Sequence, residues 1–302
     1  MRSSFIALLL VSGSLTAGAA VEVSVQKHIC PGGQTYPVHL TFDDGPRIPQ
    51  TLQILDTLKK NNIKATFLIS TTRFKSLLNG KPNESTKRLM EVIERMKTEG
   101  HTVGSHSFEH IEHGNIAKHT EAEISSNIAK SAAIIDKLKL PKPTPFRFPY
   151  GSGWFQDPDS ANQSMASKAM RQIKAQGYRP FHWDIDTWDW SKIKRKALPG
   201  SVLEQVCNHK GGVVLAHDIH SWTVENLPAI IESINLSGHK LVSYSEIAKY
   251  SEQQAPEPLM SFADHAGGIR SCKKHVGDLD QVGAVCDTGV SNKKDNSQDG
   301  VQ

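Results

Sequence analysis

Residues 40–46 read Leu-Thr-Phe-Asp-Asp-Gly-Pro, an apolar strand that ends in two adjacent carboxylates and a Gly-Pro break. Neighbouring side chains on a regular strand point to opposite faces, so Asp43 and Asp44 share one site only where the strand stops being regular. We expect Gly45 and Pro46 to supply that irregularity. The simpler interpretation is a strand followed by an acidic turn, because Asp, Gly and Pro are common turn residues.

Beyond this stretch, strands alternate with helices. The sequence predicts strands over 38–42, 63–69, 101–105, near 146, and over 178–184, 213–217 and 241–243. It predicts helices over 49–61 and 86–98, one that begins with a capping box at Thr120 and Glu123, one over 164–176, and further helices before 250. A polar stretch over 71–85 predicts a long loop. The alternation indicates an α/β fold, a parallel sheet or barrel with its site at the carboxyl ends of the strands.

The two ends of the chain depart from this pattern. Residues 1–19 have the layout of a secretory signal peptide: Arg2, then an apolar run, then small residues. The apolar run is too short to span a bilayer, so we expect an exported protein, periplasmic or secreted, without an integral membrane segment in the mature chain. The main domain covers 30–250, an extension covers 251–290, and 291–302 is polar enough that we expect disorder.

The charge of the chain is mild, at +4 over 302 residues. We find no basic run with interleaved aromatic residues, so we do not expect nucleic acid as a partner, although a weakly basic protein suits an anionic polymer. We expect a monomer.

The four cysteines lack the CxxC spacing of a zinc site, and export favours disulfides. Three pairings are open to four cysteines. We favour Cys272 with Cys286, which lie close together in a Gly-containing extension, and less firmly Cys30 with Cys207. Free structural thiols are the alternative.

A histidine pair follows the strand predicted over 101–105. His106 and His110 are four residues apart, so a helical turn after the strand would place both imidazoles on one side, as two metal ligands. In a chain with 14 histidines, a chance exposed pair is the alternative. With Asp44 the pair makes a His-His-carboxylate set, a usual arrangement for a catalytic zinc with an open position.

Three more clusters follow strand ends. Arg147 lies among apolar neighbours in 146–151 and would need a carboxylate partner if buried. Residues 183–190 pack three carboxylates and three Trp together, which suits a sugar that stacks on rings while its hydroxyls bind acceptors. A core Trp cluster with solvated acids is the alternative. His217 ends an apolar strand, a natural place for a general acid.

These five clusters, in this order, resemble the five motifs of the NodB-homology polysaccharide deacetylases, carbohydrate esterase family 4. The resemblance covers about residues 36–250. It implies a distorted (β/α) barrel with fewer than eight full units, here with a disulfide-bearing C-terminal extension.

The resemblance also implies roles for individual residues. Asp43 would be the general base, paired with Arg147. The ligands of one divalent metal, zinc first and Co, Mn or Ni otherwise, would be Asp44, His106 and His110.

The remaining roles concern the substrate and the leaving group. His217 would be the general acid and Asp189 would hold its imidazole. The backbone N–H of Tyr150 would face the oxyanion, while Trp190 and Leu215 would form walls for the acetyl methyl group.

The function implied is metal-dependent removal of N-acetyl groups from N-acetylglucosamine in a polysaccharide. Peptidoglycan fits a mildly basic exported chain somewhat better than chitin or chitooligosaccharide, and acetylated xylan is a further alternative. A glycosidase is disfavoured because its paired carboxylates must stand apart across a bond. A carbohydrate-binding protein without catalysis would use the Trp cluster alone.

Overall fold

The structure, a computed structural model, describes residues 25–115, 117–152, 161–191 and 199–253, with the backbone of 272–273 and 285–286. The signal peptide predicted over 1–19, the tail over 291–302 and most of the extension lie outside these residues. The strands of the main sheet are β1 (Pro37–Asp43), β2 (Thr66–Ile69), β3 (Thr102–Ser105), β4 (Thr144–Phe146), β5 (Tyr178–Pro180), β6 (Ile185–Asp186), β7 (Gly212–His217) and β8 (Lys240–Leu241). The α-helices are α1 (Gln50–Lys60), α2 (Glu84–Thr98), α3 (Glu121–Lys137), α4 (Ala161–Ala175), α5 (Gly200–His209), α6 (Ser221–Leu236) and α7 (Tyr244–Gln253), and short 3₁₀ helices are η1 (Pro31–Gly33), η2 (Thr71–Asn79) and η3 (Pro149–Gly151).

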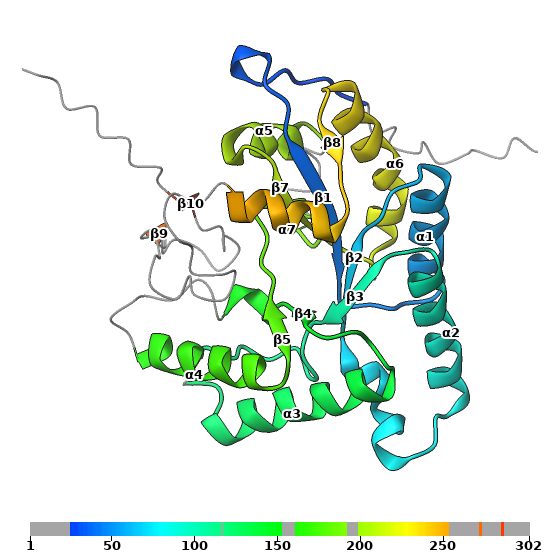
Figure 1. Ribbon diagram of the computed structural model, residues 1–302, viewed down its shortest axis with the longest axis vertical. Helices are drawn as coiled ribbons and strands as arrows, with labels where there is room; N and C mark the ends of the chain where they lie inside the picture. Colours follow the sequence, from blue (N-terminus) through cyan, green and yellow to red (C-terminus); the bar gives the residue numbers. More distant parts are fainter. Residues whose placement is uncertain are drawn as a thin grey trace, which may run out of the picture.

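The eight strands form one parallel sheet in the order β5-β4-β3-β2-β1-β7-β6, with β8 paired to β1. The sheet curls with helices around it, as Figure 1 shows. Because β5 and β6 are the two ends of this order, the sheet is a half-barrel and not a closed barrel. The predicted distorted (β/α) barrel is confirmed. A parallel sheet brings all carboxyl strand ends to one edge, which is where the predicted clusters lie.

Alternation along β1 separates the apolar core from the inside of the half-barrel. Val38, Leu40 and Phe42 are buried in the main core, which the helices complete. His39 and Thr41 lie on the other face and are satisfied by hydrogen bonds to Thr66 and Val214, among others. Asp43 continues that polar face, because side chains two residues apart point the same way.

The predicted loop over 71–85 was wrong. The structure has the 3₁₀ helix η2 there, and α2 begins at Glu84. The Asn83 side chain caps α2 by accepting a hydrogen bond from the Thr86 backbone at 2.8 Å. The sequence did not reveal the start of α2, because Asn83 follows Asn-Gly and Pro turn signals and Asn is common both in turns and at helix N-caps.

Strand lengths were also overestimated at two places. The strand predicted over 63–69 begins at Thr66, and the strand predicted over 178–184 ends at Pro180. The predicted capping box of α3 is confirmed, with Thr120 and Glu123 bonded reciprocally.

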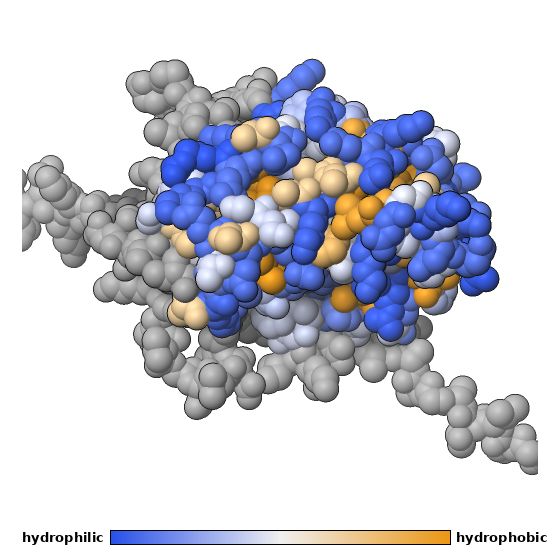
Figure 2. Space-filling model, turned by 90° about the horizontal axis from the view of Figure 1, so that it is seen from below, coloured by the Kyte–Doolittle hydropathy of each residue, from blue (hydrophilic) through white to orange (hydrophobic). Residues whose placement is uncertain are grey.

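The described residues contain no helix that is both long and apolar enough to cross a bilayer. On the face drawn in Figure 2, hydrophobic side chains occupy small separate areas among hydrophilic ones. Most of the strongly apolar residues in the described part of the chain lie inside, between sheet and helices, whereas Ile29, Ile48 and Leu236 are exposed.

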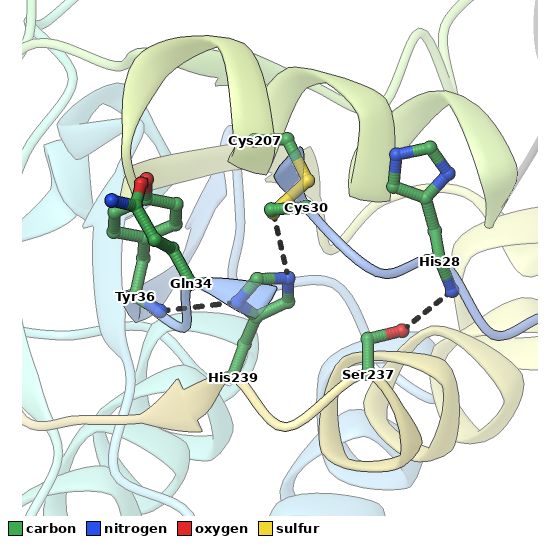
Figure 3. The surroundings of a disulfide bond; sticks show 7 residues. All are labelled: His28, Cys30, Gln34, Tyr36, Cys207, Ser237 and His239. Atoms are coloured by element: carbon green, nitrogen blue, oxygen red, sulfur yellow. Dashed lines mark hydrogen bonds between the residues drawn. A yellow bond between two sulfur atoms is a disulfide. The ribbon is translucent and has the colours of Figure 1, made fainter. Parts of the chain in front are cut away.

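A disulfide joins Cys30 to Cys207, which confirms one predicted pairing. It fastens the segment before β1 to α5, as Figure 3 shows. Beside it, the Tyr36 backbone N–H donates to Nδ1 of His239 at 3.1 Å, so Nε2 of His239 carries the proton and faces Cys30 Sγ at 3.7 Å. Cys30, Cys207 and His239 lie close enough together for a metal, but the two sulfurs are bonded to each other and the free imidazole nitrogen is protonated.

The extension has one described feature. Residues Cys272–Lys273 (β9) and Val285–Cys286 (β10) pair antiparallel, with Cys272 opposite Cys286. The disulfide between these two cysteines stays a prediction.

We expect the Cys30→Ala, Cys207→Ala double variant to be less stable, because the bond closes a loop between residues 177 apart. Loss of a native crosslink of this kind costs about 2–5 kcal/mol. In a domain of this size that lowers Tm by roughly 5–15 °C, measurable by calorimetry. The bond precedes β1 and β7, at the end of the sheet away from the site, so metal content should not change. An unchanged Tm would show that the bond does not stabilise the fold.

Candidate active site and metal centre

Asp43 and Asp44 both reach the carboxyl end of β1 because the chain turns at Asp44. Asp44 has φ 77°, in the left-handed region that few non-glycine residues adopt. Its backbone N–H still donates to the Leu68 carbonyl at 3.2 Å, so the turn is held against β2. The irregularity therefore begins at Asp44 itself and not at Gly45 and Pro46, which corrects the sequence expectation.

Arg147 is the partner of Asp43. Its Nη1 lies 2.8 Å from Asp43 Oδ1, and both side chains are buried, with Asp43 only 1% exposed. The other guanidinium nitrogens donate to the carbonyls of Phe181 and His182. Burial raises the pKa of Asp43, against the opposing charges of Arg147 and His217. Asp43 is thus a desolvated carboxylate held in place by Arg147, which suits a general base.

His106 and His110 lie together, but not through a helical turn. Ser107 has φ 72° and His110 has φ 41°, so the segment is a loop. It is held by Ser107 Oγ, which accepts from the His110 N–H at 3.1 Å, and by Asn127 Oδ1 of α3, which accepts from the Phe108 N–H at 3.0 Å. The expected helical geometry was wrong, although the two rings do face one site, 5.0 Å apart between centroids.

Asp44, His106 and His110 form a donor set that fits a metal ion. One ligand atom from each lies within 4.8 Å of the others, and Asp44 Oδ1 is 3.4 Å from His110 Nε2 and 3.7 Å from His106 Nε2. Nδ1 of His106 lies 3.0 Å from the Arg147 carbonyl, which fixes its proton there and leaves Nε2 with a lone pair. Burial lowers the pKa of His106 to about 3, so this imidazole is neutral, as a ligand must be.

His217 and Asp189 form a second pair, at the end of β7, the strand next to β1. Nδ1 of His217 is 2.7 Å from Asp189 Oδ1, and the His217 backbone N–H donates to Asp189 Oδ2 at 2.7 Å. Burial opposes charge on His217, but the charge and hydrogen bond of Asp189, with Asp43 and Asp44 beyond, outweigh it and raise the pKa of His217 to about 10. The imidazole is thus held as a cation with Nε2–H free to donate.

The three residues expected to contact substrate differ in exposure. Tyr150 is 64% exposed, with its ring 4.6 Å from that of His110, and Trp190 is 46% exposed. Leu215 is buried on β7, two residues before His217 and therefore on the same face of the strand. All three lie on segments that carry the catalytic groups, and their contacts with substrate stay predictions.

The carboxylates of 183–190 are not a set of free sugar acceptors, which corrects the interpretation from sequence. Each accepts a backbone hydrogen bond: Asp184 from Val213, Asp186 from Trp188 and Asp189 from His217. The ring of Trp183 lies 5.6 Å from the Arg147 guanidinium. Most of this cluster therefore builds the site, and Trp190 is the exposed one of its three tryptophans.

Sequence reasoning missed two supporting hydroxyls. Thr41 Oγ1 accepts from Arg147 Nη1 at 2.8 Å, and Thr223 Oγ1 donates to Asp189 Oδ2 at 2.7 Å. Thr41 had a signal, since a polar residue two before Asp43 belongs to the same face of the strand. Thr223 had none, because it lies on α6 and meets Asp189 only through the fold.

Comparisons with known proteins agree with this geometry. Residues 33–178 match the family described as polysaccharide deacetylase. The chain is 27% identical over 221 residues to a peptidoglycan-N-acetylglucosamine deacetylase of Bacillus cereus (72% of this chain, 70% of that protein). It is 29% identical over 217 residues to a chitin deacetylase of Arthroderma benhamiae (69% of this chain, but only about half, 51%, of that protein). The structure of peptidoglycan deacetylase PdaC from Bacillus subtilis superposes with TM-score 0.52 at 27% identity, over 73% of this chain and 94% of that one.

Proposed function

We propose that this chain, which belongs to the polysaccharide deacetylase family, hydrolyses the N-acetyl groups of N-acetylglucosamine residues in peptidoglycan. One divalent metal ion, zinc first, would be held by Asp44, His106 and His110. We further propose that the chain is exported to the periplasm or outside the cell and acts as a monomer.

The observation that carries the proposal is the convergence of three groups at one edge of the sheet. The groups are a His-His-carboxylate donor set, a carboxylate paired with Arg147, and, on the neighbouring strand, a histidine paired with Asp189. A glycosidase has no use for the donor set, and a binding module has no use for a buried acid and base. Amide hydrolysis uses all three.

The residues of the chain would divide the work as follows. A bound divalent ion supplies Lewis acidity, lowering the pKa of water and polarising the amide oxygen. Asp43 accepts the proton of the attacking water, and its pairing with Arg147 keeps the carboxylate in place. His217 delivers a proton to the departing amine, which is a poor leaving group while unprotonated.

The substrate contacts follow from the same segments. The backbone N–H of Tyr150 would donate to the developing oxyanion. Trp190 and Leu215 would enclose the acetyl methyl group, one from the exposed side and one from β7.

Chitin or chitooligosaccharide is the second candidate substrate, because a chitin deacetylase matches the chain at an identity similar to that of the peptidoglycan enzymes. Acetylxylan is a third. Acetate release measured by mass spectrometry, on peptidoglycan fragments and chitooligosaccharides side by side, tests the proposal. Release from peptidoglycan fragments supports it, and release only from chitooligosaccharides or xylan replaces the substrate. If the purified protein bound no divalent metal and released acetate from none of these substrates, the remaining interpretation would be a carbohydrate-binding protein without catalysis.

The pairing of Asp189 with His217 predicts the alkaline side of the pH profile. A general acid works only while protonated, so activity falls as pH rises through its pKa, which Asp189 helps to raise to about 10. In Asp189→Asn the burial of His217 is no longer opposed by the nearest carboxylate, so its pKa falls. We expect the alkaline limb of kcat to move down by about three pH units, which lowers kcat at pH 8 by about tenfold.

Thr223→Val is the matched control for this change. It removes one hydrogen bond to Asp189 but leaves the carboxylate charge next to His217. The alkaline limb should then stay close to its wild-type position, because the charge that raises the pKa of His217 is retained. An alkaline limb that stays in place in Asp189→Asn would exclude His217 as the acid.

A further inference from the structure

Two arginines beside the catalytic loops have no carboxylate partner among the described residues. Arg47 follows the Asp43–Pro46 turn, and its Nη1 donates a hydrogen bond to the Ile219 carbonyl at 3.3 Å. Arg73 lies in η2 and donates from Nε to the Asp44 carbonyl at 2.9 Å. Within the described part of the chain, no carboxylate comes within ion-pair distance of either guanidinium.

Other arginines of the chain show the contrast. Arg147 is fully enclosed by acceptors, and Arg95 pairs with Asp56 and Glu99. By comparison, Nε and Nη2 of Arg47 and both Nη atoms of Arg73 have no acceptor among the described residues. Arg47 is exposed and Arg73 half-buried. A guanidinium that is anchored at one nitrogen and free at the others is prepared for a planar, doubly hydrogen-bonded anion such as a carboxylate.

The anchors of the two arginines place them on both sides of the end of β1. Arg73 comes from the segment after β2 and holds the backbone of Asp44, whose carboxylate faces His110. Arg47 reaches toward the loop after β7, where Ile219 lies two residues beyond His217. An anion bound by these guanidinium groups would therefore lie next to the reacting sugar.

The negative charges of the site are neutralised without the positive charges of Arg47 and Arg73. The negative charges of Asp43, Asp44 and Asp189 are met by Arg147, by the cationic His217 and, when bound, by a divalent ion. Arg73 also acts electrostatically on the Asp218 carboxyl, which is buried, and burial raises the pKa of Asp218 to about 7. Arg47 and Arg73 are thus excess positive charge at the opening of the site, which favours an anionic ligand.

We propose that Arg47 and Arg73 form a subsite for a carboxylate carried by the glycan next to the sugar that is deacetylated. This proposal rests on the proposed function. In peptidoglycan the carboxylate comes either from the lactyl ether of muramic acid or from the attached peptide, and chitin carries none. The subsite would select an anionic glycan over a neutral one of the same length.

The test measures binding, so that it does not depend on turnover. Three ligands are titrated by calorimetry into the metal-loaded Asp43→Asn protein: an N-acetylglucosamine–N-acetylmuramic acid disaccharide, the same disaccharide with its peptide, and neutral N,N′-diacetylchitobiose. We expect Arg47→Gln and Arg73→Gln, added singly, each to reduce the ratio of anionic to neutral affinity by about tenfold, as loss of a charge-assisted hydrogen bond does. Arg47→Lys should keep part of the preference. Arg88→Gln, an exposed arginine of α2, should keep all of it.

The ligands separate the two sources of the carboxylate. A reduced ratio for the bare disaccharide identifies the lactyl group, and a reduced ratio only with the peptide present identifies the peptide. An unchanged ratio in both arginine variants overturns the subsite, even if acetate release supports the proposed function. Loss of metal in Arg73→Gln without a change in the ratio would also overturn its part, by showing that Arg73 serves Asp44 alone. A reduced ratio without acetate release by the wild-type protein supports the subsite and refutes the deacetylase.

Discussion

His110→Ala and His106→Ala should each lower the bound divalent metal from about one equivalent to a small fraction, and deacetylation with it. The donor set has three members within 4.8 Å, so removal of one leaves two, too few for a firmly held catalytic ion. Lewis-acid stabilisation is worth several kcal/mol, so we expect turnover to fall by about a thousandfold or more. Metal analysis by mass spectrometry after gel filtration, together with acetate release, measures both effects.

The two variants differ in what else they remove. His106 is buried and its Nδ1 also bonds the Arg147 carbonyl, so its loss disturbs the loop after β4 as well. His110 has a partly exposed side chain, and its replacement tests the ligand role with less damage to the fold. His209→Ala, an exposed histidine at the end of α5, is the control and should retain metal and activity. Full metal content in both site variants would refute the ligand assignment.

The positions of the catalytic clusters could be predicted because each follows an apolar strand. In a parallel sheet every such strand delivers its carboxyl end to the same edge, so order along the chain becomes proximity in space. That is why Asp43, His106, Arg147 and His217 meet although they come from β1, β3, β4 and β7 and the loops that follow. No detail of the loops was needed for this step.

The loop conformations could not be predicted in the same way. A spacing of four suggested a helical turn for His106 and His110, yet the loop is held by Asn127 on α3, and no local pattern near His106 signals that contact. The left-handed conformation of Asp44 was likewise hidden, because Gly45 beside it is the residue that normally adopts such angles. Gly45 is needed for another reason: an added Cβ would lie 2.0 Å from the Asp218 carboxylate.

The Trp-rich stretch shows how composition misleads when the partners are distant. Three carboxylates near three Trp suggested a sugar platform, but the acceptors of Asp184 and Asp189 are used by β7 and His217. These two bonds link residues that are 29 and 28 positions apart in the sequence. The local sequence shows which residue types are present. Only the fold shows which carboxylate supports a catalytic residue and which holds the backbone.

Asp43→Asn should nearly abolish turnover while the metal stays bound. The Asn side chain is close to isosteric and keeps an oxygen that can accept from Arg147, but it cannot take a proton from water. Loss of a general base costs about a hundredfold to ten-thousandfold in kcat. Asp44→Asn should behave differently, because it weakens a ligand that lies 3.4 Å from His110 Nε2, so metal affinity and activity should fall together. Metal titration of both variants, beside acetate release at saturating metal, separates base from ligand.

Stability provides the control for this comparison. In Asp43→Asn the buried Arg147 loses its counter-charge, and breaking a buried pair costs about 3–5 kcal/mol, so the apo variant should melt lower than wild type. The Asp44 carboxylate has no arginine or lysine partner within the described part of the chain, and Asp44→Asn should melt close to wild type in the apo state. Thr41→Val removes an acceptor of Arg147 without touching the carboxylates, so it should lower Tm but keep the metal and most of the activity. Replacing a residue that acts on water and not on the ion removes catalysis but leaves the ion bound. The division of roles between the two adjacent carboxylates would therefore be wrong if Asp43→Asn lost its metal as Asp44→Asn does. It would also be wrong if Asp43→Asn kept full turnover with metal bound.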